Sequence, residues 1–235
     1  MGALIHITRR LFLKFAGGAI AMASIPRSLC GFFIKALPVR TVEKNTFKFN
    51  VGRGLIEWQQ GSKEEYRLVV DGLVKAPKSF SYLEIKSFPQ TEQVSDFHCV
   101  EGWSVRDLQW GGFRFKEIMD RIEPQKNATH VLFHSFGITG SLPGGQSHYI
   151  ESFPIKELLD PEREILLVLA ADNQPLPEEN GGPLRLIAPY DLGYKSIKFI
   201  TRIEFVKGER PGWWTLANPI YPVDGPVPKE RLRKK

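Results

Sequence analysis

Residues 96–104 read DFHCVEGWS and set Cys99 between His98 and Glu101, shortly before a glycine. A single cysteine inside a folded domain is most often a small buried apolar side chain. Its thiolate is also a soft ligand for a redox metal, and charged neighbours favour that role. A cysteine protease is the other chemistry open to this thiol, with His134 or His148 as the base.

The number of cysteines narrows the chemistry. The chain has 235 residues and two cysteines, Cys30 and Cys99, with no CxxC or CxxCH motif. Zinc ribbons, covalently attached haem and disulfide frameworks are therefore excluded. A disulfide between Cys30 and Cys99 stays open as an alternative if both cysteines remain after export.

A glycine-rich loop and a basic segment form a second candidate site. The loop reads ENGGPLR at residues 179–185, and the segment YKSIK follows at residues 194–198. Backbone amides of such a loop, together with Arg185, Lys195 and Lys198, have the chemistry to hold a phosphate. A tight glycine turn beside a lysine-bearing strand is the structural alternative.

Short strands outnumber helices around these two clusters. Apolar runs rich in β-branched residues predict the strands, and apolar residues three to four positions apart predict the helices. The predicted strands span residues 66–70, 94–100, 129–134, 165–170, 184–188 and 196–206, and the predicted helices span 81–85, 113–122 and 155–159. Residues 31–60 are predicted to be an irregular lead-in. The sequence therefore predicts an α+β domain with short helices.

Three groups of residues resemble one family, in that family's order. CVEGWS at residues 99–104, followed by WGG at 110–112, is similar to the molybdenum-binding cysteine segment of the sulfite-oxidase-like molybdopterin-binding oxidoreductases. NGGPLRLIAP at 180–189 and GYKSIK at 193–198 resemble the pterin-binding segment, and YRLVVDGLV at 66–74 resembles the opening strand. The resemblance implies the α+β sulfite-oxidase-like fold, with mixed sheets and short helices.

The resemblance also implies a cofactor site. Cys99 would be the thiolate ligand of molybdenum and the catalytic residue. The cofactor would be molybdenum-molybdopterin, in contact with Asn45, His134, Asn180, Arg185, Ser196, Ile197 and Lys198. Asn180 favours the periplasmic methionine sulfoxide reductase catalytic subunits within the family, because sulfite oxidases tend to carry histidine at that position.

The implied reaction is oxygen-atom transfer, and reduction of a methionine sulfoxide-like group, small or protein-bound, is the first hypothesis. A sulfite-type oxidase is the alternative, and it would need a cationic pocket built from residues such as Arg53, Arg106, Arg114 and Lys116. A non-catalytic exported binding module that retains the fold is the hypothesis from a different class. Electrons would come from a membrane cytochrome b or a soluble cytochrome c, because the sequence has no haem or iron–sulfur motif.

The N-terminal residues have the pattern of a targeting signal. TRRLFLK at residues 8–14 precedes FAGGAIAMA at 15–23, so paired arginines are followed by a short apolar stretch rich in small residues. This pattern predicts a twin-arginine signal over residues 1–30 and export to the periplasm. The stretch is shorter than the roughly 20 residues of a membrane-spanning helix. One domain over residues 31–228 and a basic tail over 229–235 are predicted to follow.

The positive net charge is concentrated at the ends of the chain. The formal charge is +6, yet residues 31–228 carry 23 basic and 25 acidic side chains. A nucleic-acid-binding domain carries its basic residues on its folded surface, so nucleic acid is excluded as a partner. The basic tail is expected to be solvated rather than to dock on an acidic partner or a membrane surface.

Overall fold

The computed structural model describes residues 34, 37–39, 41–43 and 47–233. The predicted twin-arginine signal and the predicted cofactor contact Asn45 lie outside these residues. Within the described part of the chain, no helix is long and apolar enough to cross a membrane. The same residues form three β-sheets joined by short helices, which confirms the predicted α+β class.

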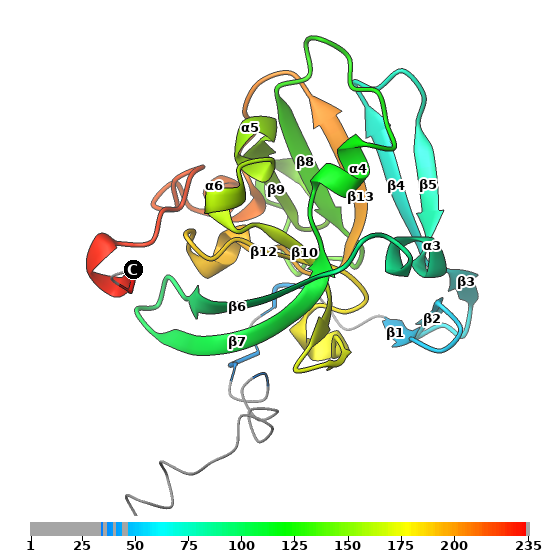
Figure 1. Cartoon of the computed structure of the whole chain (residues 1–235), viewed down its shortest axis with the longest axis horizontal. Helices are drawn as coiled ribbons and strands as arrows, with labels where there is room; N and C mark the ends of the chain where they lie inside the picture. Colours follow the sequence, from blue (N-terminus) through cyan, green and yellow to red (C-terminus); the bar gives the residue numbers. More distant parts are fainter. Residues whose placement is uncertain (1–33, 35–36, 40, 44–46, 234–235) are drawn as a thin grey trace, which may run out of the picture. The chain divides into compact units, whose positions relative to one another are not determined.

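One five-stranded sheet stands upright in Figure 1 and contains several of the strands predicted from apolar patterns. Its order is β5 (Lys78–Ser81), β4 (Arg67–Gly72), β13 (Ile200–Val206), β8 (His130–Ser135) and β9 (Ile150–Pro154). Strand β13 runs parallel to β4 and antiparallel to β8. Leu68 and Val70 on β4 are fully buried, as are Ile203 and Phe205 on β13, because alternate side chains of a strand face the core.

A second sheet crosses below the first and carries the cysteine segment (Figure 1). Its strands are β6 (Thr91–His98), β7 (Ser104–Phe113), β10 (Leu166–Ala171), β11 (Gln174–Pro175) and β12 (Arg185–Ile187). β6 and β7 form a hairpin in which His98 is paired with Ser104, so residues 99–103 are its turn. β10 pairs with both β7 and β12, and the cysteine hairpin and Arg185 therefore belong to one sheet.

The irregular lead-in predicted before residue 60 is wrong from residue 47 onward. There β1 (Phe47–Asn50) pairs antiparallel with β2 (Leu55–Trp58), and β3 (Lys63–Glu65) completes a three-stranded sheet. Phe47 packs against Phe136 and Phe199, with ring centroids 4.2 and 5.3 Å apart. Strands of three or four residues are too short to give a clear apolar period, so the sequence does not reveal them.

The helices are short, and α3 (Tyr82–Lys86) begins where the sequence predicts it. The Ser81 hydroxyl accepts a hydrogen bond from the Glu84 amide, and the Glu84 carboxylate accepts one from the Ser81 amide. The other α-helices are α4 (Lys116–Met119), α5 (Ile155–Leu158) and α6 (Trp213–Ala217). Short 3-10 turns are η2 (Pro143–Gly145), η3 (Pro161–Arg163), η4 (Glu178–Asn180), η5 (Gly193–Lys195) and η6 (Lys229–Arg231).

Three predicted elements differ from the structure. The buried strand predicted over residues 94–100 is β6, which ends at His98 and leaves Val94 60% exposed. The helix predicted over residues 113–122 is reduced to the four residues of α4, because the unpredicted strand β7 extends to Phe113. The strand predicted from residue 196 begins only at Ile200, because Phe199 has a φ of 56°, which lies outside the extended region.

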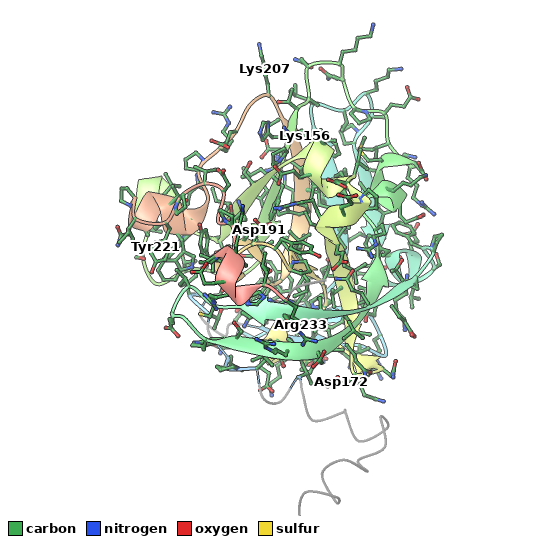
Figure 2. The ribbon with its side chains drawn as sticks, turned by 60° about the vertical axis from the view of Figure 1, so that its left-hand side comes forward. Lys156, Asp172, Asp191, Lys207, Tyr221 and Arg233 are labelled. Atoms are coloured by element: carbon green, nitrogen blue, oxygen red, sulfur yellow. The ribbon has the colours of Figure 1, made fainter. Side chains whose placement is uncertain are left out.

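The expectation of a solvated basic tail is wrong over residues 229–233. This segment includes η6, and Arg233 forms ion pairs with Asp96 on β6 and Asp107 on β7, at 2.7 and 2.8 Å. Figure 1 shows η6 beside the tip of the β6–β7 hairpin, and Figure 2 shows the labelled Arg233 against the same hairpin. The described part of the tail therefore contacts acidic residues of the cysteine hairpin.

Candidate cofactor site

A cavity of about 300 Å³ lies where the cysteine turn, the basic segment and the N-terminal described residues meet. It is lined by five of the predicted site residues, Cys99, Arg185, Ser196, Ile197 and Lys198. Most of its other lining is apolar or aromatic, including Phe97, Trp103, Tyr149, Trp214 and Tyr221. The fold therefore brings the two clusters seen in the sequence to one cavity.

The turn of the β6–β7 hairpin presents Cys99 to this cavity. The Cys99 amide donates to the Trp103 carbonyl at 2.9 Å, and the Gly102 amide donates to the Cys99 carbonyl at 3.1 Å. Gly102 has a φ of 95°, a conformation that favours glycine. Because the backbone groups of the turn are satisfied internally, the half-buried Cys99 side chain is directed by the turn rather than by a helix or strand.

Aromatic and polar neighbours fix the turn on both sides. The Phe97 and Trp103 rings are stacked with centroids 6.1 Å apart, and the indole N–H of Trp103 donates to the Glu101 carboxylate at 2.8 Å. His98 is buried, and its Nδ1 lies 2.8 Å from the Ser104 hydroxyl. Burial, aided by the nearby Arg231 charge, lowers the pKa of His98 and favours a neutral ring beside the cysteine.

Arg185 is the main buried cation of the site, with 1% of its surface exposed. Its guanidinium donates to the carbonyl oxygens of Asn180 and Ser196, at 2.6 and 3.2 Å, and forms no ion pair within the described residues. The rings of Phe97 and Trp110 lie 5.7 and 5.6 Å from it. Burial lowers the pKa of Arg185 to about 9. An uncompensated buried charge is costly, so this arrangement favours an anionic ligand in the cavity.

The glycine loop places a second cation beside the first. Gly181 has a φ of 109°, and a Cβ atom there would lie 2.8 Å from Cγ of Lys198. The half-buried Lys198 ammonium donates to the Glu179 carbonyl at 2.9 Å. Burial, followed by the nearby Arg185 charge, lowers the pKa of Lys198 to about 7. The loop needs glycine at this position so that the two cations can approach the same part of the cavity.

The third cation suggested by the sequence does not take part. The Lys195 ammonium is buried in an ion pair with Glu151 at 2.6 Å, and it also donates to the carbonyls of Ser152 and Val223. Lys195 is absent from the described lining of the cavity. The suggestion that Lys195 holds a phosphate is therefore wrong, because its ammonium is bound by Glu151 and two carbonyls, whereas Ser196, Ile197 and Lys198 line the cavity.

Two further predicted contacts are not in the described lining of the cavity. The His134 ring lies between His148 and Glu204, with nitrogen–nitrogen and nitrogen–oxygen distances of 2.9 Å each. Burial, with a contribution from Arg202, lowers the pKa of His134 to about 4. Asn180 is buried behind the cavity, where its backbone carbonyl supports Arg185.

Other residues of the site were not suggested by the sequence. Thr41 and Glu43 line the cavity from the N-terminal side, and the Thr41 hydroxyl donates to the Glu43 carboxylate. The Tyr149 hydroxyl donates to the Tyr194 carbonyl at 2.5 Å, which holds the start of the basic segment. None of these residues belongs to a local motif, so only the tertiary contacts reveal them.

The arrangement defines a class of site: a pocket for an anionic cofactor that brings a metal to a protein thiolate. Cys99 offers a soft ligand for a metal. Arg185 offers a buried positive charge that forms no ion pair with a carboxylate of the described residues. The side-chain nitrogen of Asn180, which lies outside the cavity lining, is buried with no hydrogen-bond partner in the described structure. No cluster of three or more metal-ligating side chains occurs in the described chain. Cys99, Arg185 and Lys198 together fit a metal held by an organic, phosphate-bearing cofactor.

Comparison with known proteins identifies that cofactor class. The sequence pattern of the oxidoreductase molybdopterin binding domain matches residues 56–214, and the chain belongs to this family. The protein-methionine-sulfoxide reductase catalytic subunits MsrP of Ralstonia nicotianae and Burkholderia mallei are 37% and 34% identical over 160 residues. Each match covers 66% of this chain and 47% of the relative, so the chain spans about half the length of these curated relatives.

A solved structure supports the fold independently. The sulfane dehydrogenase SoxCD from Paracoccus pantotrophus aligns with a TM-score of 0.53 at 16% identity, covering 88% of this chain and 56% of that chain. At this level of identity the likeness concerns the fold alone. It confirms the predicted sulfite-oxidase-like architecture, and the family match confirms a molybdopterin-binding oxidoreductase domain.

Proposed function

We propose that this protein binds molybdenum-molybdopterin and reduces a sulfoxide of the methionine sulfoxide type by oxygen-atom transfer. The observation that carries the proposal is a cavity lined by Cys99, by the buried cation Arg185 and by the half-buried cation Lys198. Cys99 would ligate the metal, whereas Arg185 and Lys198 would bind the phosphate of the cofactor together with the backbone of Ser196 and Ile197. The likeness to two methionine sulfoxide reductase subunits supports the choice of reaction.

The lining of the cavity favours a neutral substrate over sulfite. Sulfite would need a cation beside the metal. Arg185 and Lys198 are the basic residues that line the cavity among the described residues, and the proposal assigns both to the cofactor phosphate. Two other candidates are engaged elsewhere: Arg114 donates to the Ile165 carbonyl at 2.9 Å, and Lys116 forms an ion pair with Asp120. The aromatic and apolar lining suits a thioether-like group, free or within a protein.

The molybdenum centre, when bound, would supply two-electron oxygen-atom transfer. A sulfoxide, two electrons and two protons would yield a thioether and water. The protein would fix the cofactor through its charges and limit water around the reacting atoms through the Phe97 and Trp103 rings. The electrons would come from a membrane cytochrome b or a soluble cytochrome c. Export to the periplasm by the twin-arginine route would deliver the protein already folded with its cofactor.

The decisive experiment measures metal content and chemistry in protein purified from the periplasm of a molybdate-fed, twin-arginine-competent host. We expect about one molybdenum per chain and reduction of methionine sulfoxide by a reduced viologen dye. Cys99→Ser should remove the thiolate-to-molybdenum absorption and lower the activity more than about a hundredfold. Mutation of residues that only hydrogen-bond to a metal ligand already lowers metal affinity or activity by about 10- to 100-fold, and Cys99 would be the ligand itself.

Lys207→Gln, an exposed lysine that does not line the cavity, is the control and should retain both signals. Sulfite oxidation without sulfoxide reduction would replace the proposed substrate with the sulfite-type alternative. Folded, exported protein without molybdenum would contradict the enzymatic proposal and leave the non-catalytic binding module.

A further inference from the structure

Residues 221–233, which we call the C-terminal strap, run along the basic segment that lines the cavity. The Leu192 amide donates to the Gly225 carbonyl at 2.6 Å, and the Val227 amide donates to the Tyr190 carbonyl at 2.9 Å. The Tyr194 hydroxyl donates to the Pro222 carbonyl at 2.8 Å. The first part of the strap is therefore bonded to the chain immediately before Ser196.

The strap ends on the cysteine turn through Arg231. Its Nη1 donates to the Cys99 carbonyl at 2.9 Å, and its Nη2 donates to the Trp103 carbonyl at 2.6 Å and to the Ser104 hydroxyl at 3.0 Å. The guanidinium thus bonds to both ends of the turn at once. Its planar fork can satisfy several acceptors in a fixed geometry, which a lysine ammonium cannot reproduce.

These bonds add to a turn that already has its own. The Cys99 carbonyl also accepts from the Gly102 amide, and the Trp103 carbonyl also accepts from the Cys99 amide. The turn can therefore form without Arg231, and the additional bonds restrict how it moves and where it points. The ion pairs of Arg233 with Asp96 and Asp107 attach the end of the strap to the same hairpin (Figure 2).

We propose that Arg231 is a positioning residue that fixes the orientation of the Cys99 turn relative to the anion-binding side of the cavity. The strap joins these two sides because one part bonds to residues 190–194 and the other to the cysteine turn. The consequence for metal ligation rests on the proposed function, in which Cys99 binds molybdenum. The restraint of the turn itself does not depend on a cofactor.

Hydrogen–deuterium exchange of cofactor-free protein tests the restraint directly. In Arg231→Gln we expect the amides of Cys99 and Gly102 to exchange about tenfold faster, as expected for the loss of charge-assisted hydrogen bonds. Arg231→Lys keeps the charge but not the planar fork, so the turn amides should exchange at a rate between those of the parent protein and of Arg231→Gln. Lys229→Gln, an exposed charge in the same 3-10 turn, is the matched control and should leave the rate unchanged.

Electron paramagnetic resonance of molybdenum(V) in the loaded protein tests the effect on ligation. Arg231→Gln should shift or broaden the signal, because it depends on the orientation of the thiolate sulfur. Lys229→Gln should match the parent, and Arg231→Lys should restore part of the parent signal. If Arg231→Gln does not fold, Arg231→Lys carries both measurements.

The outcomes separate the two proposals. Equal exchange of the turn in the Arg231 variants and in Lys229→Gln would overturn the positioning role, whatever the metal content. Faster exchange with an unchanged molybdenum signal would also overturn it, because the restraint would not reach the ligand. Faster exchange in a protein that never acquires molybdenum would overturn the proposed function alone.

Discussion

The charge of Arg185 explains how a single buried residue selects the kind of ligand. Desolvation of a guanidinium costs free energy, and only carbonyl oxygens of the described chain compensate for it. The lowered pKa of about 9 reflects the same cost. A dianion such as a phosphate ester would repay this cost and would bind Lys198 as well, so the unfavourable charges become useful when the cofactor enters.

Lys198 should make anion binding to the cofactor-free protein depend on pH. Because its pKa is lowered to about 7, the ammonium is present below this pH and lost above it. We therefore expect sulfate, which keeps its charge throughout, to bind roughly tenfold more weakly at pH 8.5 than at pH 6, since one charge-assisted contact is lost. Isothermal titration calorimetry measures both affinities.

The lowered pKa of Lys198 should also make the stability of the protein depend on pH, in the opposite direction to anion binding. The unfolded state holds the Lys198 proton up to its ordinary pKa, so the unliganded protein should gain stability from this group as pH rises above about 7. Lys198→Gln should bind sulfate weakly at every pH, whereas Lys207→Gln, an exposed lysine, should behave as the parent. A Lys198→Gln variant with the parental pH dependence would disprove the assignment.

At the scale of elements, the glycine loop between η4 and β12 controls the distance between the two cations. Gly181→Ala would force a left-handed φ of 109° on alanine and bring its Cβ within 2.8 Å of the Lys198 side chain. We expect a loss of about 1–3 kcal/mol in the free energy of unfolding, and weaker sulfate binding because Lys198 must move. Gly140→Ala is the control, since a Cβ there meets nothing within 4 Å. Equal urea midpoints for the two variants would contradict this account.

The strands that the sequence predicts share one property: each has a continuous or alternating run of apolar residues that are buried in the fold. β10 is an example, since four successive residues from Leu166 to Leu169 are buried. β7 escapes prediction because its first half carries the exposed polar residues Ser104, Arg106 and Asp107, which interrupt the apolar pattern. Phe115, Ile118, Met119 and Ile122 suggested one helix over residues 113–122. The segment instead contains the end of β7 at Phe113, a turn at Phe115 and the short helix α4.

The residues of the candidate site also fall into two groups: those that a local motif predicts and those that only the tertiary structure reveals. Cys99 and the residues from Arg185 to Lys198 belong to local motifs, so the sequence reveals them. Glu43, Tyr149 and Arg231 reach the site only through tertiary contacts, and the composition of the basic tail pointed instead to solvent. His134 shows the reverse: its alignment with a family position predicted a cofactor contact, whereas its ring is held by His148 and Glu204.

At the scale of the whole described domain, the buried ion pair of Glu151 and Lys195 joins three parts of the chain. Glu151 lies on β9 of the upright sheet, Lys195 lies on η5, and the Val223 carbonyl that also accepts from Lys195 belongs to the C-terminal strap. Both side chains of the pair are nearly inaccessible to solvent. The pair therefore anchors the strap and the basic segment to the sheet, although desolvation limits its net contribution to stability.

Lys195→Met should reveal this connection because it leaves a carboxylate buried without its counter-charge. We expect a loss of about 3–5 kcal/mol in the free energy of unfolding at neutral pH, measured by urea denaturation.

Burial already raises the pKa of Glu151, and Lys195 opposes that rise, so the variant should raise the pKa further. The folded state then binds the Glu151 proton more tightly than the unfolded state, and the deficit should shrink as pH falls toward the ordinary carboxyl pKa. Adding Glu151→Met should remove most of the pH dependence, because the buried charge is gone. Part of the loss should remain, because the Ser152 and Val223 carbonyls lose the Lys195 donor. A pH-independent deficit in Lys195→Met would show that Glu151 is not the group left uncompensated, and the strap would then be anchored through its backbone bonds alone.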